Sequence, residues 1–216
     1  MRLMIIGATG RTGKDLLSLA LQNNNEVVAY VRSPQKLNAT TNLTIIKGQL
    51  DDYHALAKAL VGCDAVLVTL GNSVTNSSAN LFSFAMPNII KAMHLAKVER
   101  IINLSALGVG STYKNTRFPY RLGAKTFLKG NFHDHYLGES LLKTSNLKWT
   151  TIHPGPLFNN ERTPNPTVRF AKSNFKMPGA PRTNRMDVAQ LMLNIVNNPA
   201  TFNQQLLICS KQDTNS

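Results

Sequence analysis

The amino-acid sequence predicts an α/β fold, a doubly wound parallel sheet with helices on both faces. Short apolar runs rich in Val, Ile and Leu recur along the chain, as in strands that are buried on both faces of a parallel sheet. Amphipathic segments with helical spacing lie between these runs. The chain has 216 residues, 43% of them hydrophobic, which is enough for the core of one large domain. We therefore expect residues 1–216 to form a single domain.

The apolar runs predict strands, in chain order, at Leu3–Ile6, Val27–Val31, Leu43–Lys47, Ala65–Leu70, Ile101–Leu104, Trp149–His153 and Gln205–Cys209. The amphipathic spacing predicts helices at Lys14–Gln22, Tyr53–Val61, Asn80–Ala96 and Met186–Val196. Asp51 and Asp52 form the cap signal of the second helix, and Pro87 should kink the third helix or mark its true start. This alternation implies right-handed crossovers between the strands.

The segment from Leu157 to Arg185 interrupts the alternation. It is rich in polar residues and contains four prolines, Pro164, Pro166, Pro178 and Pro181. A loop of this length in a compact domain is usually a lid or a binding loop. Because it follows the sixth strand, it should lie near the carboxyl ends of the strands, where open sheets bind ligands. We expect this loop-rich segment, residues 157–185, to cover the substrate.

Composition excludes several classes of protein. No apolar stretch approaches the roughly 18 residues that a membrane span needs, and the strand-like run at Leu3 leaves no room for a signal peptide. The two cysteines, Cys63 and Cys209, provide neither a disulfide framework nor a zinc site. We expect a cytoplasmic protein that binds no membrane and no metal, as a monomer rather than an oligomer.

The net charge of +13 is unevenly distributed. Between Tyr113 and Arg185 there are 13 Lys and Arg residues against three acidic residues. A positive field attracts anions, whether phosphate-bearing cofactors, acidic substrates or nucleic acid, although a general compositional bias with no specific partner is an alternative explanation. No nucleic-acid recognition motif accompanies the charge. We therefore expect an anionic or planar aromatic small-molecule substrate, and no specific nucleic acid.

A glycine-rich loop, Gly7-Ala8-Thr9-Gly10-Arg11-Thr12-Gly13, joins the first expected strand to the first helix. Gly7 permits a tight turn, Gly10 lets the backbone approach a pyrophosphate, and Gly13 allows close packing of helix on strand. The helix N-terminus offers N–H groups to phosphates. The spacing differs from the commoner G-x-G-x-x-G, and a tight turn without a ligand is the alternative. The strand before it and the helix after it favour a Rossmann-like dinucleotide site.

The end of the second expected strand indicates which dinucleotide is bound. An acidic residue there would bind the ribose 2′-hydroxyl of NAD, but the sequence reads Tyr30-Val31-Arg32-Ser33. Arg32 can pair with a 2′-phosphate, Ser33 can donate a hydrogen bond to it, and Arg11 is a plausible second clamp. The alternative is that Arg32 is a solvated charge at the end of a strand. The sequence predicts NADP(H) as the cofactor.

The sequence resembles the atypical short-chain dehydrogenase/reductases. The likeness rests on the glycine-rich loop, the Val31-Arg32-Ser33 strand end, Ser105 after the fifth strand and the His153-Pro154-Gly155-Pro156 stretch after the sixth. Within that family, the sequence is most similar to the NmrA-like NAD(P)H-binding group, in the branch of the biliverdin-IXβ and NADPH-dependent flavin reductases. The likeness runs from Met1 to about Cys209.

The resemblance implies roles for residues at the strand ends. It places at the pyrophosphate Gly7, Thr9, Gly10, Arg11 and Thr12, with Arg32 and Ser33 at the 2′-phosphate. It places Gln49 and Leu50 near the adenine, although many relatives have Asp in place of Gln49. It places Leu70 and Gly71 near a ribose. It implies that Ser105 orients the nicotinamide and that His153, followed by Pro154, lines the pocket or relays a proton. Ser105 and His153 are the candidate catalytic residues.

One motif of ordinary short-chain dehydrogenases is missing. The residues four positions after Tyr113, Tyr120 and Tyr136 are Arg, Ala and Ser, so no Tyr-x-x-x-Lys is present. Alcohol–ketone chemistry, which depends on a tyrosine acid, is therefore disfavoured. The flavin-reductase branch also lacks the motif. We expect an NADPH-dependent reductase that transfers hydride to a planar conjugated acceptor such as a flavin, a biliverdin-like tetrapyrrole or a quinone. The alternative is a non-catalytic NADP(H) sensor of NmrA type.

Two other groups of residues could suggest a different chemistry, a metal site and a hydrolase. His133-Asp134-His135 has no further ligand at metal-binding spacing, so we interpret it as a polar helix start near the substrate pocket. Ser105 with His153 would suggest a hydrolase, but neither residue lies in G-x-S-x-G and no acid partner is evident in the sequence.

Overall fold

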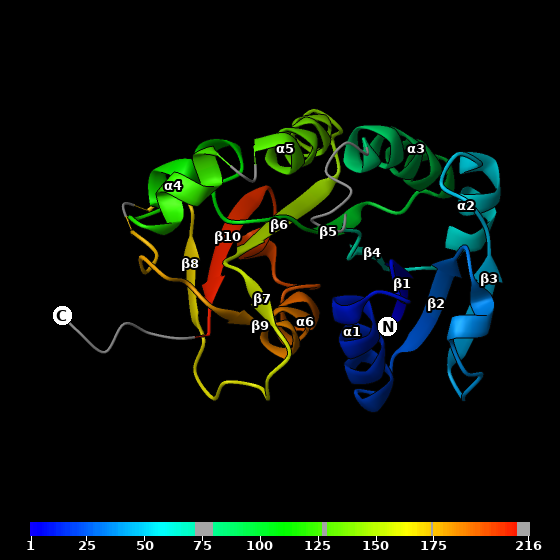
Figure 1. Ribbon diagram of the computed structural model, residues 1–216. Helices are drawn as coiled ribbons and strands as arrows, with labels where there is room; N and C mark the ends of the chain where they lie inside the picture. Colours follow the sequence, from blue (N-terminus) through cyan, green and yellow to red (C-terminus); the bar gives the residue numbers. More distant parts are fainter. Residues whose placement is uncertain (72–79, 127–128, 174, 211–216) are drawn as a thin grey trace.

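The computed structural model describes residues 1–71, 80–126, 129–173 and 175–210, and an eight-stranded sheet forms its centre (Figure 1). The strands lie in the order β3 (Leu43–Lys47), β2 (Glu26–Val31), β1 (Arg2–Ile6), β4 (Ala65–Val68), β5 (Arg100–Leu104), β6 (Lys148–Pro154), β10 (Gln204–Cys209) and β8 (Thr167–Phe170). All neighbours are parallel except β8 and β10, which are antiparallel. The strand order reverses between β1 and β4, which is where open sheets bind ligands. The predicted fold class is confirmed.

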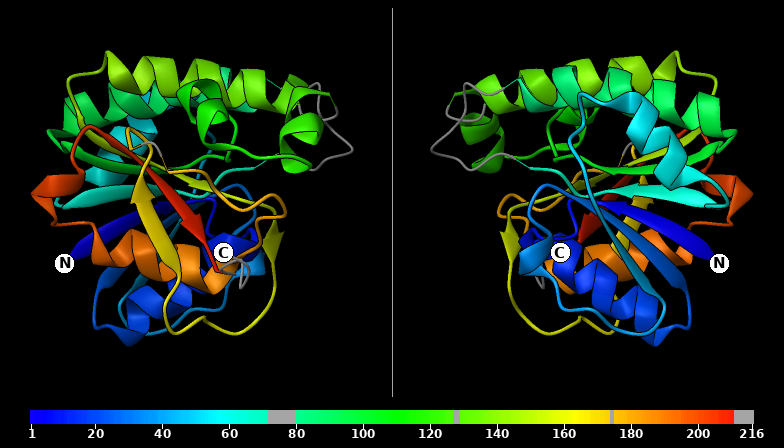
Figure 2. Two further views of the ribbon diagram at one scale, coloured as in Figure 1. Left: turned by 90° about the vertical axis from the view of Figure 1, so that its left-hand side faces the viewer. Right: turned by 90° about the vertical axis from the view of Figure 1, so that its right-hand side faces the viewer.

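Helices cover both faces of the sheet (Figure 2). One face carries α1 (Arg11–Gln22) and α6 (Arg185–Asn194), and the other carries α2 (Tyr53–Leu60), α3 (Leu81–Ala96) and α5 (Lys129–Lys143). Alternate residues of β1 supply the two cores: Leu3 packs toward α1 and α6, and Met4 packs toward α2 and α3. The described helices are each too short or too polar to traverse a lipid bilayer.

All seven predicted strands are present, with ends shifted by at most two residues, and so are the four predicted helices. Asp52 caps α2 as expected, since its side chain accepts a hydrogen bond from the Ala55 amide at 2.9 Å. Pro87 does not mark the start of α3, because the helix begins at Leu81 and continues through it. Burial of Phe82, Met86 and other apolar residues on the inner face outweighs the one backbone hydrogen bond that proline removes.

Helix α5 begins at Lys129, four residues before the polar helix start expected at His133, and the short helix α4 (Tyr120–Lys125) was not predicted. The inner face of α5 explains why its pattern was not recognised: Asp134 and Glu139 are buried there beside Leu142. A helix whose buried face carries carboxylates lacks the apolar stripe by which an amphipathic helix is recognised. These buried carboxylates belong to the candidate site described below.

The loop-rich segment expected at residues 157–185 is present, and it also contains short strands that were not predicted. The segment contains β8, which extends the main sheet, and the strands β7 (Leu157–Phe158) and β9 (Thr183–Asn184), which form a small parallel sheet of their own. Residue 174 lies outside the described residues. The remaining described connections, residues 159–166, 171–173 and 175–182, are irregular and make up most of the segment.

Candidate functional site

The glycine-rich loop lies at the carboxyl end of β1, at the point where the strand order reverses. Gly7 has φ +93°, a conformation that L side chains rarely adopt, and its carbonyl oxygen accepts a hydrogen bond from the Gly10 amide at 2.9 Å. A Cβ on Gly13 would lie 2.0 Å from the Gly7 oxygen. Helix α1 begins directly afterward at Arg11, so the N–H groups of its first turn have no partner within the helix. This loop can hold a phosphate against a helix N-terminus.

Two exposed arginines lie next to this loop and at the neighbouring strand end. Arg32 follows β2 and Arg11 opens α1, while Ser33 beside Arg32 is partly buried. Arg185, at the start of α6, was missed by the sequence analysis. Burial lowers the pKa of Arg185, and the neighbouring charge of Arg11 lowers it further while Asp15 opposes the shift. The edge of the sheet near α1 is therefore positively charged.

The residues assigned to the adenosine half follow the next strands along the same edge. Gln49 and Leu50 come after β3, and the Tyr30 hydroxyl on β2 donates a hydrogen bond to the Gln49 carbonyl at 3.2 Å. Leu70 and Gly71 come after β4, and the residues from 72 to 79 lie outside the described part of the chain. Because these neighbouring strands are parallel, all four residues lie at the same edge of the sheet as the glycine loop, the edge formed by the carboxyl ends of the strands.

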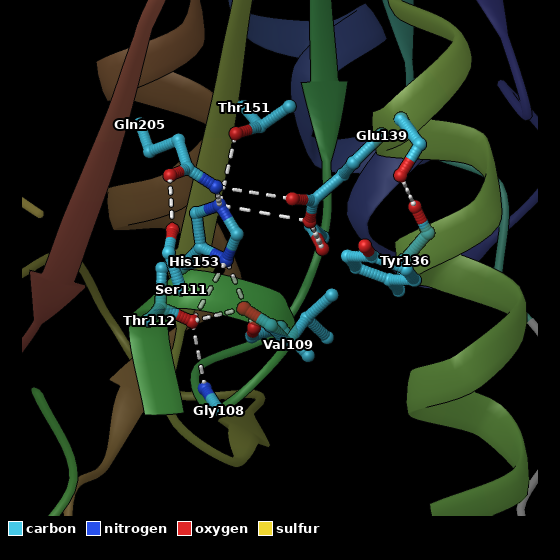
Figure 3. A network of polar contacts seen from close by, with 12 residues as sticks. Gly108, Val109, Ser111, Thr112, Tyr136, Glu139, Thr151, His153 and Gln205 are labelled. Atoms are coloured by element: carbon cyan, nitrogen blue, oxygen red, sulfur yellow. Dashed lines mark hydrogen bonds and ion pairs between the residues drawn. The ribbon is translucent and has the colours of Figure 1, made fainter. Parts of the chain in front are cut away.

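A buried polar network joins Ser105, Glu139 and His153 (Figure 3). Ser105 follows β5, and its hydroxyl lies 2.5 Å from Glu139 Oε1 on α5. The other carboxylate oxygen, Oε2, accepts a hydrogen bond from Gln205 Nε2 on β10 at 3.1 Å. The Ser111 hydroxyl in turn lies 2.6 Å from Gln205 Oε1. The network therefore connects α5 with the strands β6 and β10, which are far apart in the sequence.

His153 on β6 is fully buried behind this contact. Its Nδ1 lies 2.9 Å from the carbonyl oxygen of Ala106, an acceptor only, so Nδ1 carries a hydrogen in this arrangement. Its Nε2 lies 2.9 Å from the Thr151 hydroxyl and 3.6 Å from Glu139 Oε1. The side chain thus fixes the backbone after Ser105. Since His153 has no exposed surface, it can act on a ligand only through its neighbours.

The expectation that Ser105 and His153 have no acid partner is wrong. Glu139 lies between them, 34 residues after Ser105 in the chain. The order of contacts still differs from that of a hydrolase, in which the serine bonds to histidine and the histidine to the acid. Here the serine donates to the acid directly. No local sequence signal marks Glu139, because the contact arises only when α5 packs on the sheet.

The three tyrosines considered as acids have different surroundings. The Tyr120 hydroxyl donates to the Leu107 carbonyl at 2.8 Å, and burial raises its pKa. The Tyr113 ring lies 4.9 Å from the Arg121 guanidinium. Tyr136 is half-exposed on α5 near Glu139, and Ser140, which occupies the position of the missing lysine, donates to the Tyr136 backbone carbonyl at 2.8 Å (Figure 3). No Tyr-x-x-x-Lys pair forms.

His133-Asp134-His135 is a structural feature of α5. Asp134 is buried and caps α3, accepting hydrogen bonds from the Phe82 and Ser83 amides at 2.8 and 2.9 Å. The His135 ring packs on Phe82, with ring centroids 4.0 Å apart. Within the described ranges, no group of three or more His, Cys, Asp or Glu side chains is arranged to hold a metal ion.

His135 makes stability depend on pH. Burial lowers its pKa from 6.5 to about 4, with His153 adding to this effect and Asp134 opposing it. As pH falls from 6.5 toward 4, the unfolded chain binds a proton that the native state excludes, so native stability decreases. We expect the wild type to lose about 2 kcal/mol more than a His135→Phe variant between pH 7 and pH 4.5 in urea unfolding. Parallel pH profiles for the two proteins would contradict this assignment.

The segment after β7 is tied to the start of α6. Arg185 Nη1 donates to Asn159 Oδ1 at 2.6 Å, and the Thr163 amide donates to Asp187 Oδ1 at 2.8 Å. Asn184 Nδ2 also donates to the Glu161 carbonyl at 3.0 Å. Asp187 is itself buried and receives a hydrogen bond from Ser210. This part of the predicted covering segment is therefore fixed in place by side chains of α6.

The fold and the glycine loop together define a dinucleotide-binding α/β protein. A family model described as NAD(P)H-binding matches residues 7–199, so the chain belongs to the NAD(P)H-binding family. This finding confirms the predicted nicotinamide cofactor. The curated relatives include an uncharacterized sugar epimerase, YhfK, from Bacillus subtilis, which is 28% identical over 184 residues, covering 80% of this chain and 78% of the relative.

Solved structures share the fold at low sequence identity. ChuY, an anaerobillin reductase from Escherichia coli O157:H7, matches with a TM-score of 0.80 and 22% identity, covering 100% of both chains. A wide-type short-chain dehydrogenase/reductase from Veillonella parvula, solved in complex with NADP, matches with a TM-score of 0.81 and 16% identity, covering 96% of this chain and 94% of the other.

Proposed function

We propose that this protein is an NADPH-dependent reductase that transfers hydride to a planar conjugated acceptor: a flavin, a biliverdin-like tetrapyrrole or a quinone. The observation that carries the proposal is the Ser105 hydroxyl, which Glu139 holds at the carboxyl end of β5. The sequence contains no Tyr-x-x-x-Lys pair for alcohol chemistry. The likeness in fold to ChuY, an anaerobillin reductase, supports an acceptor of this class.

The proposed cofactor position assigns one part of NADPH to each strand end. The glycine loop, with Thr9, Arg11 and Thr12, holds the pyrophosphate. The 2′-phosphate lies between Arg32 and Ser33 after β2, the adenine lies near Gln49 and Leu50, and a ribose lies near Leu70 and Gly71. When bound, NADPH supplies the hydride.

At the nicotinamide end, Ser105 donates its hydroxyl hydrogen to Glu139, so its oxygen lone pairs are left to accept from a carboxamide N–H. His153 holds the backbone between Ser105 and Leu107 through the Ala106 carbonyl, and Pro154 accepts from the Leu107 amide at 2.8 Å. The side chains provide position and electrostatics, while the redox chemistry belongs to cofactor and acceptor.

The acceptor is proposed to lie against the segment around α4. Phe118 and Leu122 are exposed there, the former by 77%, and Arg117 and Arg121 are exposed beside them. Aromatic and guanidinium side chains bind planar rings and carboxylate or phosphate groups. This combination fits an acceptor that is flat and carries anionic substituents.

A screen of NADPH oxidation tests the proposal. Purified protein is mixed with NADPH and, in turn, FMN, riboflavin, biliverdin and a quinone, and absorbance at the NADPH band is followed. We expect steady turnover with at least one of them, reduced by replacing Ser105 with alanine. NADPH binding with no turnover on any acceptor would contradict the proposal and favour a non-catalytic NADP(H) sensor.

We expect each of the variants Tyr113→Phe, Tyr120→Phe and Tyr136→Phe to retain kcat within about tenfold of the wild type, because a true general acid contributes 10²–10⁴-fold. The Tyr120 hydroxyl donates a hydrogen bond to the Leu107 carbonyl, so Tyr120→Phe should lower the free energy of unfolding without lowering kcat by more than this factor. A thousandfold loss of kcat in any one variant with unchanged NADPH affinity would identify that tyrosine as the acid.

A further inference from the structure

We infer that the buried carboxylate of Glu139 makes the cofactor site discriminate between the two oxidation states of the nicotinamide and favours the positively charged, oxidised form. The inference rests on the proposed function, because it requires the nicotinamide to lie beside Ser105. It assigns Glu139 a role that acts through Ser105 rather than by contact with the cofactor.

The contacts of Glu139 are those of an ionised carboxylate. Its side chain has no exposed surface, and each oxygen faces a hydrogen-bond donor, the Ser105 hydroxyl at 2.5 Å and the Gln205 amide at 3.1 Å. A hydroxyl that donates to a carboxylate anion typically lies 2.5–2.7 Å away. Gln205 Nε2 can only donate, so Oε2 carries no proton, and Oε1 accepts from the Ser105 hydroxyl.

No cation among the described residues neutralises this charge. The one titratable group within ion-pair distance is the His153 ring, at 3.6 Å. Its Nδ1–H is directed to the Ala106 carbonyl and its Nε2 is satisfied by the Thr151 hydroxyl, so the contacts are complete with a neutral ring. His135, one turn earlier on α5, is neutral near pH 7 because burial lowers its pKa to about 4.

A buried negative charge next to the nicotinamide has a different effect on each form of the cofactor. The ring is neutral in NADPH, and it becomes cationic when the hydride leaves with its electron pair to the acceptor, which then takes a proton from solvent. At an effective dielectric constant of about 20, unit charges separated by roughly 6–10 Å shift an equilibrium by about ten- to hundredfold. The carboxylate therefore favours hydride donation over hydride uptake.

The experiment measures dissociation constants for NADP⁺ and for NADPH, by calorimetry, on the wild type and on Glu139→Gln. Glutamine keeps the shape and an acceptor for Ser105 but removes the charge. We expect the ratio Kd(NADP⁺)/Kd(NADPH) to rise at least tenfold, through weaker binding of NADP⁺. Ser111→Ala is the matched control: it removes the hydrogen bond to Gln205 Oε1 from the same network without touching Glu139 or His153, and should leave the ratio within about twofold.

If Glu139→Gln weakens the binding of NADP⁺ and of NADPH by the same factor, the inference is overturned and Glu139 is a structural residue only. If that variant does not fold, Gln205→Lys provides the second test, because Gln205 is partly exposed and a lysine there would place a cation beside the carboxylate. It should raise the ratio in the same direction, and an unchanged ratio overturns the inference. Binding needs no acceptor, so a failure of the proposed reductase activity shows separately, as absence of turnover.

Discussion

Replacing Gly13 with alanine is expected to abolish detectable NADPH binding and to lower the free energy of unfolding by about 3 kcal/mol. The added Cβ would lie 2.0 Å from the oxygen and 2.7 Å from the carbon of the Gly7 carbonyl, and 2.8 Å from Thr69 Oγ1. The first two are backbone atoms, so relief of the clash requires α1 to move away from β1. That movement displaces the helix N-terminus that is proposed to hold the pyrophosphate.

Urea unfolding and NADPH fluorescence titration measure the two effects. Gly123→Ala in α4 is the control, because nothing lies within 4 Å of its added Cβ, and it should match the wild type in cofactor affinity. A Gly13→Ala variant with wild-type affinity would show that the loop does not bind the pyrophosphate.

Replacing Arg32 with alanine is expected to weaken NADPH binding by ten- to hundredfold and to leave NADH binding unchanged. A hydrogen bond between a guanidinium and a phosphate contributes about 1.5–3 kcal/mol, and NADH has no 2′-phosphate to receive it. The Arg32 side chain is exposed at the end of β2, so its removal should not affect folding. The wild type should accordingly bind NADPH more tightly than NADH by the same factor.

Calorimetry with both cofactors gives the four dissociation constants that are needed. Lys36→Ala, which removes another exposed cation four residues away, controls for a general loss of positive charge and should alter NADPH affinity by less than threefold. Equal affinity of the wild type for NADPH and NADH would contradict the assignment of Arg32.

The cofactor half of the candidate site could be proposed from the sequence because its chemistry is local. The glycine loop is seven consecutive residues that run from the end of a strand into the first turn of a helix, and Arg32 directly follows a strand. The parallel sheet then brings the strand ends to one edge. The fold class depended on the same short-range patterns of apolar residues, and these are strongest in strands that are buried on both faces.

Glu139 could not be predicted in this way. Its partners Ser105 and Gln205 are 34 and 66 residues away in the sequence. The extent of the helix that carries it was not predicted, because Glu139 and Asp134 on its buried side reduce its apolar periodicity. Buried polar residues that serve a site weaken the pattern by which their own helix is recognised.

The position of β10 has a consequence for the candidate site. It is the last strand of the described residues, yet it lies inside the sheet between β6 and β8 and contributes Gln205 to the carboxylate of Glu139. Without β10, the buried Glu139 carboxylate would have only one of its two hydrogen-bond donors. The contacts of the candidate site are therefore complete only when this strand is in place.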